Sequence, residues 1–109
     1  MKNKNIYELR IYTIKPEGLP KLLKLWENEG NALIEKYMKC LGVWNSESGV
    51  LNKVFHMYYW ENYKARELAR KNFYNDKNAK EYIKKVKPLY QKQESYLLSC
   101  ADFSKIQLK

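Results

Sequence analysis

Histidine and cysteine are scarce in this sequence, and both are common ligands of protein metal sites. The chain has one histidine, His56, and two cysteines, Cys40 and Cys100, which lie far apart. Glycine-rich phosphate loops, nucleophile elbows and paired-carboxylate patterns are also absent. We therefore expect no metal and no other cofactor, and we expect both cysteines to be free thiols in a reducing cytoplasm.

Long apolar segments are missing as well. No uninterrupted apolar run approaches the ~20 residues that a membrane-spanning helix needs, and residues 1–5 lead into an alternating segment rather than into the apolar region of a secretion signal. With 45% hydrophobic residues, 4 glycines and 3 prolines, disordered or low-complexity sequence is excluded too. The length is that of one cytoplasmic domain, which we place at residues 1–109 with a core of about 6–103.

Arginine is the third scarce residue type. The formal net charge is +9, yet only 3 of the 21 basic residues are arginines. Arginine is favoured over lysine for bidentate contacts with phosphates and bases. We therefore rank a solvated lysine-rich surface above a nucleic-acid interface, although the field of such a surface would draw anionic ligands toward a cleft.

The first part of the chain changes from a period of two to a helical period. Residues 6–14 alternate as a strand does, and Pro16 and Gly18 end this strand. Residues 17–38 carry an apolar stripe of period 3.6, which predicts one continuous helix. Because Gly30 lies within that stripe, we expect a close approach between the helix backbone and a neighbouring strand.

The rest of the chain predicts a hairpin, an interrupted helix and a last strand. Asn62 is a good N-cap for the helix, Asp76 or Asn78 can cap its continuation, and Pro88 must kink or restart it. The resulting order, βαββαβ, is that of the ferredoxin-like fold, an α+β class with a four-stranded antiparallel sheet and helices on one face. The predicted strands of this part are 41–47, 53–60 and 94–101.

Both faces of the predicted strand 53–60 are largely apolar or aromatic, which an open sheet in water does not need. We expect alternate residues of the first strand to face the helices, namely Tyr7, Leu9 and Ile11. The opposite face then holds Glu8, Arg10 and Tyr12 of the first strand with His56, Tyr58 and Trp60 of the third. We therefore predict a homodimer whose sheets stack face to face into a dimeric α/β barrel.

The face toward the predicted partner combines aromatic walls with a few polar groups, as small-molecule pockets do. We predict a pocket inside each half-barrel for a planar, polar or anionic molecule that Arg10 orients, and His56 is its candidate acid or base. The candidate ligand-binding residues are Glu8, Arg10, Tyr12, Trp44, Tyr58 and Trp60.

Each of these residues also has a purely structural interpretation. Glu8 and Arg10 fit an internal ion pair that fixes the register of the dimer, and a lone histidine in a strand is more often a hydrogen-bonded structural residue. The aromatic residues fit a dimer core without a ligand. Four further tyrosines that we assign to helices are most simply packing residues: Tyr63, Tyr74, Tyr82 and Tyr90. Whether the chain is an enzyme is left open.

Several short motifs occur in a fixed order over about residues 7–104. They are Tyr7-Glu-Leu-Arg10 with Tyr12, Trp26 with Glu29-Gly30, Leu41-Gly-Val-Trp44, Gly49-Val-Leu-Asn52, Val54 with His56, Arg66 and Arg70 within 61–70, and Gln93-Glu-Ser95. This ordered set resembles the NIPSNAP family.

The resemblance implies a dimeric α/β barrel, whose wider superfamily includes cofactor-free monooxygenases, haem-degrading enzymes and small isomerases. For the family itself it implies no firm reaction. Animal members are linked to mitochondria, vesicle traffic and mitophagy signalling and usually have longer chains with a leader. Since we find no leader, we expect a bacterial-type, single-domain, cytoplasmic member.

We therefore expect a homodimeric small-molecule-binding barrel, with monooxygenase-like or isomerase-like activity left open. The first alternative is a non-enzymatic protein-interaction adaptor, and a nucleic-acid binder is ranked last. No membrane association is expected.

Overall fold

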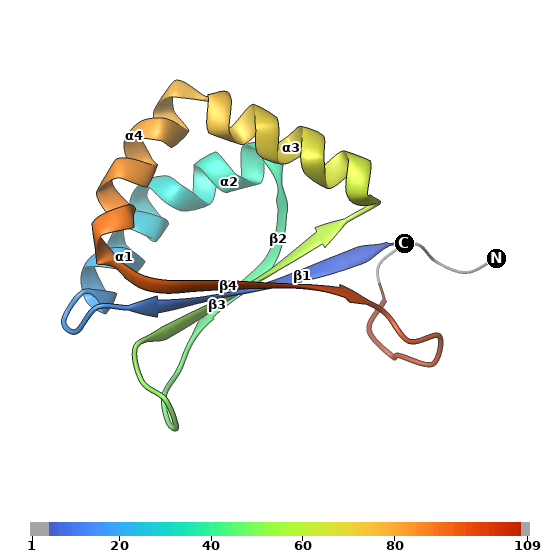
Figure 1. Ribbon diagram of the computed structural model, residues 1–109, viewed down its shortest axis with the longest axis horizontal. Coiled ribbons are helices and arrows are strands. Elements are labelled where there is room, and N and C mark those ends of the chain that lie inside the picture. Colours follow the sequence, from blue (N-terminus) through green and yellow to red (C-terminus); the bar gives the residue numbers. More distant parts are fainter. Residues whose placement is uncertain (1–4, 108–109) are drawn as a thin grey trace.

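In the computed structural model, which describes residues 5–107, four strands form one antiparallel sheet in the order β2-β3-β1-β4. Helices cover one face of this sheet (Figure 1). The predicted α+β, ferredoxin-like fold is thus confirmed, with both helical connections divided into segments. The elements are β1 (Ile6–Ile14), α1 (Leu19–Leu25), a π-helical turn (Trp26–Gly30), α2 (Asn31–Tyr37), β2 (Lys39–Asn45), β3 (Lys53–Trp60), α3 (Tyr63–Asn75), α4 (Lys77–Val86), a 3₁₀ turn (Lys87–Leu89) and β4 (Tyr90–Ser99).

The first helical connection contains a π-helical turn that the hydrophobic period did not predict. A π-helical turn closes i→i+5 hydrogen bonds and so holds more residues than an α-helical turn, which a 3.6-residue period does not describe. Gly30 ends this turn, and its close neighbour is Tyr82 of α4 rather than a strand: a Cβ atom at this position would overlap the Tyr82 hydroxyl group. The expected close approach exists, but we predicted the wrong partner for it.

The second helical connection follows its capping residues. The Asn62 side chain accepts a hydrogen bond from the Ala65 backbone N–H and caps α3, as predicted. Asp76 caps α4 by accepting from the N–H groups of Asn78 and Ala79, and it also accepts from the Tyr37 hydroxyl at 2.5 Å. Asp76 therefore joins α2 to the break between α3 and α4.

The region around Pro88 differs from the prediction. Pro88 lies in the 3₁₀ turn, and β4 begins at Tyr90, so no helix continues toward Gln93. Tyr90 is consequently a strand residue and not a helical one. Tyr90 pairs with Ile14 of β1, and its ring stacks on that of Tyr12 with 4.6 Å between the ring centroids.

The predicted assignment of the two sheet faces is wrong. Glu8, Arg10 and Tyr12 face the helices, whereas Tyr7, Leu9 and Ile11 lie on the opposite face. The reason is a cation from the helix layer, because the guanidinium group of Arg66 on α3 contacts the Glu8 carboxylate and allows its burial.

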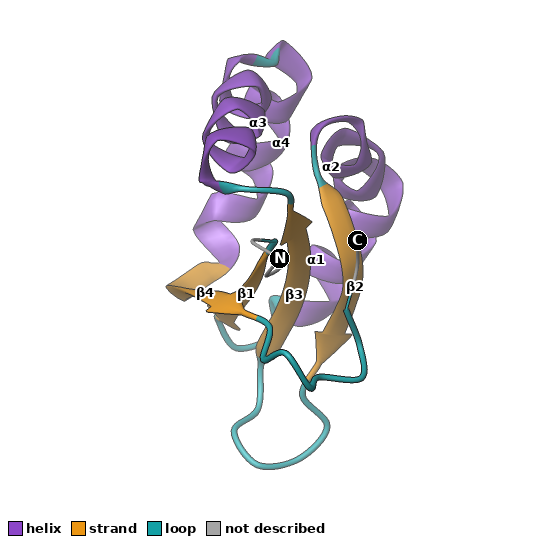
Figure 2. Ribbon diagram, turned by 90° about the vertical axis from the view of Figure 1, so that its right-hand side faces the viewer, coloured by secondary structure: helices purple, strands orange, loops and turns teal. Residues whose placement is uncertain are grey.

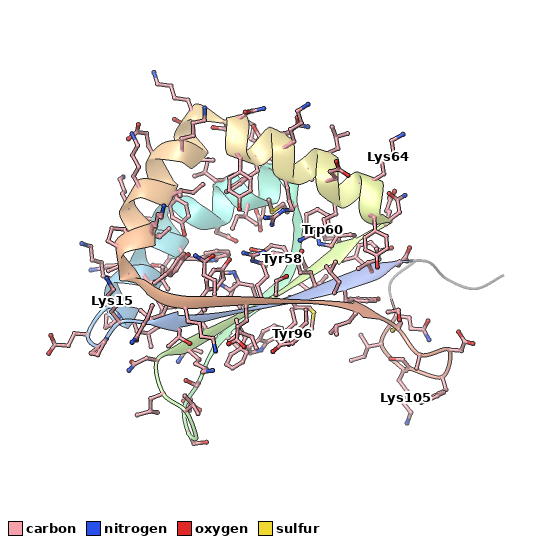
Figure 3. The ribbon with its side chains drawn as sticks, viewed as in Figure 1. Lys15, Tyr58, Trp60, Lys64, Tyr96 and Lys105 are labelled. Carbon is pink, nitrogen blue, oxygen red and sulfur yellow. The ribbon has the colours of Figure 1, made fainter. Side chains whose placement is uncertain are left out.

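The register places the third-strand residues accordingly. Glu8 pairs with Tyr58 and Arg10 pairs with His56, so these partners share the helix-facing side. Figure 3 shows Tyr58 and Trp60 between the sheet and the helices, and Tyr96 on the other side of the sheet. Tyr58 is therefore not a residue of a sheet-to-sheet interface.

The face turned away from the helices, here named the outer face, remains partly uncovered. In Figure 2 the helices lie on one side of the sheet and the loop between β2 and β3 extends away from them. Trp44, Tyr96 and Leu98 on this face are 55%, 48% and 41% exposed. Among residues 5–107, no helix is long and apolar enough to cross a bilayer.

Candidate functional site

The Glu8 carboxylate lies at the centre of the polar network between sheet and helices. Its side chain is fully buried, and its two oxygens accept five hydrogen bonds. Arg66 donates to both oxygens, at 2.9 and 3.2 Å. The other donors are Trp60 Nε1 at 3.0 Å, Arg10 Nη1 at 3.0 Å and Ser95 Oγ at 2.6 Å. All four donor residues thus converge on one buried anion.

These donors keep Glu8 ionised. Burial by itself raises the pKa of the carboxyl group, but the hydrogen bonds from Arg66, Ser95 and Arg10 outweigh burial and lower the pKa of Glu8 to about 2. Because both oxygens are saturated, Glu8 is a structural anion and offers little to a ligand.

Arg10 connects this network to the space under the helices. Its Nε donates to the Tyr12 hydroxyl at 2.8 Å and its Nη1 to Glu8. Burial alone would lower the pKa of Arg10, but the contacts with Tyr12 and Glu8 raise it by more than burial lowers it. The guanidinium group therefore stays charged. No hydrogen bond from Arg10 Nη2 to another of the described residues is found, and this group remains available as a donor.

Tyr12 presents a second donor beside Arg10. Burial raises the pKa of Tyr12 despite the nearby charge of Arg10, so its hydroxyl stays protonated. The hydroxyl oxygen accepts from Arg10, which leaves its own proton to be donated. Arg10 and Tyr12 are therefore adjacent donors that can hold one anionic group.

A cavity of about 240 Å³ adjoins these donors. Its wall is mainly aromatic, and several helix residues that the sequence analysis treated as packing belong to it. The sheet contributes Glu8, Arg10, Tyr12, Tyr58, Trp60, Tyr90 and Gln93; the helices and turns contribute Trp26, Ile34, Arg70, Phe73, Tyr74, Tyr82, Ile83, Val86 and Lys87, and Met38 lies between α2 and β2. The cavity thus lies between the sheet and the helices, not between two sheets.

His56 lies beside the cavity wall rather than in it. Its ring is 4.2 Å from that of Trp26 and 4.9 Å from that of Tyr12, measured between centroids, and its Nδ1 is 3.3 Å from the Tyr58 hydroxyl. Burial and the positive charge of Arg10 lower the pKa of His56 to about 3. The imidazole is therefore neutral near pH 7 and is a weak base.

Five of the predicted ligand-binding residues surround this one cavity, namely Glu8, Arg10, Tyr12, Tyr58 and Trp60. Trp44 does not. It pairs with Phe55, lies on the outer face, and is 55% exposed. The expectation for Trp44 fails because the register of β2 shifts between Cys40 and Gly42, which changes the side of the sheet on which later residues lie.

The sequence analysis did not assign Ser95, Trp26, Tyr82 or Arg66 to the site. One signal for Arg66 was present, since Arg66 and Arg70 are four residues apart on one helix and so share a face. That face points to the sheet: Arg66 binds Glu8, and Arg70 lines the cavity. These two arginines therefore do not form an exposed basic stripe for nucleic acid.

Comparisons with known proteins agree with this architecture. A human protein, NipSnap homolog 3A, is 29% identical over 103 residues, which are 93% of this chain and 41% of the human protein. The chain thus spans less than half the length of that relative.

Solved structures also resemble this chain. An uncharacterised NIPSNAP domain protein from Burkholderia xenovorans is 29% identical with a TM-score of 0.88, covering 93% of this chain and 99% of that one. A candidate monooxygenase from Lactobacillus acidophilus shares the fold alone, at 13% identity and a TM-score of 0.69, covering 90% of this chain and 45% of that one.

The sequence profile of the NIPSNAP family matches residues 7–105, nearly the whole chain. The chain therefore belongs to the NIPSNAP family.

Proposed function

We propose that this protein binds a small planar organic anion in the cavity between its sheet and its helices. The observation that carries the proposal is the position of its arginines. The chain has 18 lysines but only three arginines, Arg10, Arg66 and Arg70, and all three lie at the cavity or at the buried carboxylate beside it. A planar guanidinium suits bidentate recognition of a carboxylate, which an ammonium group cannot reproduce.

The charges around Glu8 do not balance. One carboxylate faces two guanidinium groups, and the side chains of Arg10 and Arg66 are only 14% and 23% exposed. An uncompensated charge that is removed from water costs several kcal/mol, on the order of what a buried ion pair loses when one partner is deleted. An anion bound to Arg10 and Tyr12 would offset this cost.

The walls and the volume favour a flat ligand. The cavity wall includes four aromatic side chains against which a flat ligand can pack, those of Tyr58, Trp60, Phe73 and Tyr82. A cavity of about 150 Å³ is enough for benzene, so the 240 Å³ found here fits one ring with substituents.

The site favours binding over acid–base catalysis. A general base works best when its pKa lies near the working pH, and the pKa of His56 is lowered to about 3. An anion bound to Arg10 would offset part of the charge that lowers this pKa. His56 therefore remains the candidate acid or base for an isomerase-like reaction only in the liganded state.

We further propose that the protein works as a homodimer through the outer face of the sheet. Exposed apolar patches of this extent mark interaction sites, and Trp44, Tyr96 and Leu98 supply one here. A protein-interaction adaptor would use the same face for a different partner, so the two proposals differ in what covers the face and not in the cavity.

The binding proposal is tested by calorimetry and thermal unfolding with sodium benzoate and related aromatic carboxylates. We expect saturable binding and an increase in the unfolding temperature, both lost in Arg10→Gln. Arg10→Lys keeps the charge without the planar fork and should bind more weakly than the wild type. Lys24→Gln, which removes a charge from α1 away from the cavity, is the matched control and should bind as the wild type does.

Two results would contradict the proposal. One is the absence of binding by every aromatic carboxylate at millimolar concentration. The other is binding by a folded Arg10→Gln variant with wild-type affinity, which would assign the arginine a structural role alone. Circular dichroism of both Arg10 variants establishes that they are folded.

A further inference from the structure

A second cationic group lies on the helix side of the same cavity. Arg70 follows Arg66 by one turn on α3 and lines the cavity, together with Lys87 of the 3₁₀ turn. Arg70 Nη2 is 3.5 Å from the Tyr74 hydroxyl, and its guanidinium lies 5.3 Å from the centroid of that ring. Within residues 5–107, neither Arg70 nor Lys87 forms an ion pair with a carboxylate. Both cations are therefore available to an anion.

The two arginines that line the cavity belong to different layers of the fold. Arg10 comes from β1 in the sheet, whereas Arg70 comes from α3 in the layer that covers it. Figure 3 shows aromatic residues, Tyr58 and Trp60, in the space between these layers. A ligand that touches both arginines would have to bridge the layers with its flat body against these rings.

The charges that line the cavity call for more than one negative group. The lining side chains include three cations, Arg10, Arg70 and Lys87, and one anion, Glu8. Glu8 is already saturated by five hydrogen bonds, so it does not neutralise the helix side. A ligand with a single carboxylate at Arg10 would leave Arg70 and Lys87 without a counter-charge.

We infer that the natural ligand is a planar dianion with an acidic group at each end, one held by Arg10 and Tyr12 and the other by Arg70 with Lys87. This inference rests on the proposed binding function and specifies the class of ligand. Carboxylate is the group that fits a guanidinium fork within the volume of one substituted ring.

Three probe ligands, each with a single aromatic ring, distinguish the effect of the number of negative charges from the effect of their positions on the ring. Benzoate carries one charge, terephthalate carries one at each end of the ring, and phenyl phosphate carries two at the same end. Each is titrated calorimetrically into the full chain at pH 7.5 and fixed ionic strength. Because terephthalate can form charge-assisted hydrogen bonds at both ends, it should bind at least about tenfold more tightly than benzoate or phenyl phosphate.

Variants on α3 test whether Arg70 binds the second acidic group of the ligand. Arg70→Gln should remove the preference for terephthalate, so that this variant binds terephthalate no more tightly than benzoate. Lys71→Gln removes the same charge from the next residue, which is exposed and does not line the cavity, and should retain the preference. If Arg70→Gln fails to fold, Lys87→Gln, on an exposed residue, should reduce the preference in its place.

The outcomes that overturn the inference differ from those that overturn the proposed function. Two results would exclude a ligand with an acidic group at each end while leaving anion binding intact. One is that benzoate binds as tightly as terephthalate, and the other is that phenyl phosphate does. If Lys71→Gln and Arg70→Gln lost the preference for terephthalate equally, the preference would come from the overall charge of the chain and not from Arg70. Absence of binding by all three probes would overturn the proposed function itself.

Discussion

Arg66 and Glu8, which are 58 residues apart in the chain, form a two-pronged contact between α3 and β1, with N–O distances of 2.9 and 3.2 Å. The contact ties the helix layer to the central strand and fixes which face of the sheet the helices cover. It also holds the carboxylate to which Arg10 donates, and so it sets the position of the group that we propose as the anion site.

Removing the charge of Glu8 should therefore destabilise the fold. Glu8→Gln leaves two guanidinium groups facing a neutral amide, and deleting one partner of a buried pair costs about 3–5 kcal/mol. Urea denaturation at pH 7 measures this loss of unfolding free energy. Glu81→Gln removes a carboxylate from an exposed ion pair with Lys84 and should cost under about 1 kcal/mol. Equal effects of the two substitutions would argue against a structural role for the buried network.

Acid should weaken the fold in two pH windows. The pKa of His56 falls from 6.5 in the unfolded chain to about 3 in the folded one, so the unfolded state binds more protons between these values. Stability is present at pH 7 and decreases as the pH falls below 6.5, by roughly 1.4 kcal/mol per pH unit. Glu8, with a pKa lowered from 4.5 to about 2, adds a loss of the same sign below pH 4.5.

A His56→Gln variant isolates the first window. Its unfolding free energy, measured by urea denaturation at pH 7 and pH 5, should change less than that of the wild type, by about 2 kcal/mol as an order of magnitude. Wild-type and variant proteins that lose the same stability over this interval would show that His56 does not titrate as described.

Gly30→Ala should reverse the usual effect of this substitution. Alanine in a helix interior is normally about 1 kcal/mol better than glycine, but here the added methyl group would overlap the buried Tyr82 hydroxyl. We expect a loss of about 1–3 kcal/mol, as for overpacked cores. Asn31→Ala, at the next and exposed position, is the control and should be neutral or stabilising. A more stable Gly30→Ala would mean that Tyr82 moves aside freely.

The homodimer proposal is tested on the outer face. Tyr96 lies there, is 48% exposed and pairs with Leu9, so Tyr96→Lys should place a charge in the sheet-to-sheet interface and raise the dimer dissociation constant. Sedimentation at micromolar concentration measures this. Tyr63→Lys, at a 65% exposed helical position, should leave the association unchanged. A wild-type chain that sediments as a monomer would exclude the dimer and favour an adaptor role for this face.

The sequence carried enough information for the strand 6–14, because its residues alternate, and for the strand 53–60, because it is rich in aromatic residues. It was also enough for the caps Asn62 and Asp76, because their side chains act locally. It did not reveal which face of the sheet the helices cover. Alternation gives two faces without saying which is inner, and both are apolar here. The deciding group, Arg66, is far away in sequence.

The same limit applies to the site. Five of the six predicted ligand-binding residues lie around one cavity because they share a sheet face, which parity alone predicts. Trp44 was misplaced because a register shift in β2 changes that parity without a clear sequence signal. The residues of the helix side, such as Tyr82 and Arg70, needed the packing of α3 and α4 on the sheet, which no local pattern encodes.

The alternation along β1 has a consequence for how this strand tolerates change. Its even-numbered residues face the helices, with Glu8, Arg10 and Tyr12 at the cavity, and its odd-numbered residues lie on the outer face, so two surfaces alternate one residue at a time. Substitutions at neighbouring positions should therefore have separable effects, and a mutational scan of β1 should show two phenotypes that alternate with a period of two. An insertion or deletion of one residue would exchange the two sets of side chains and damage both surfaces at once.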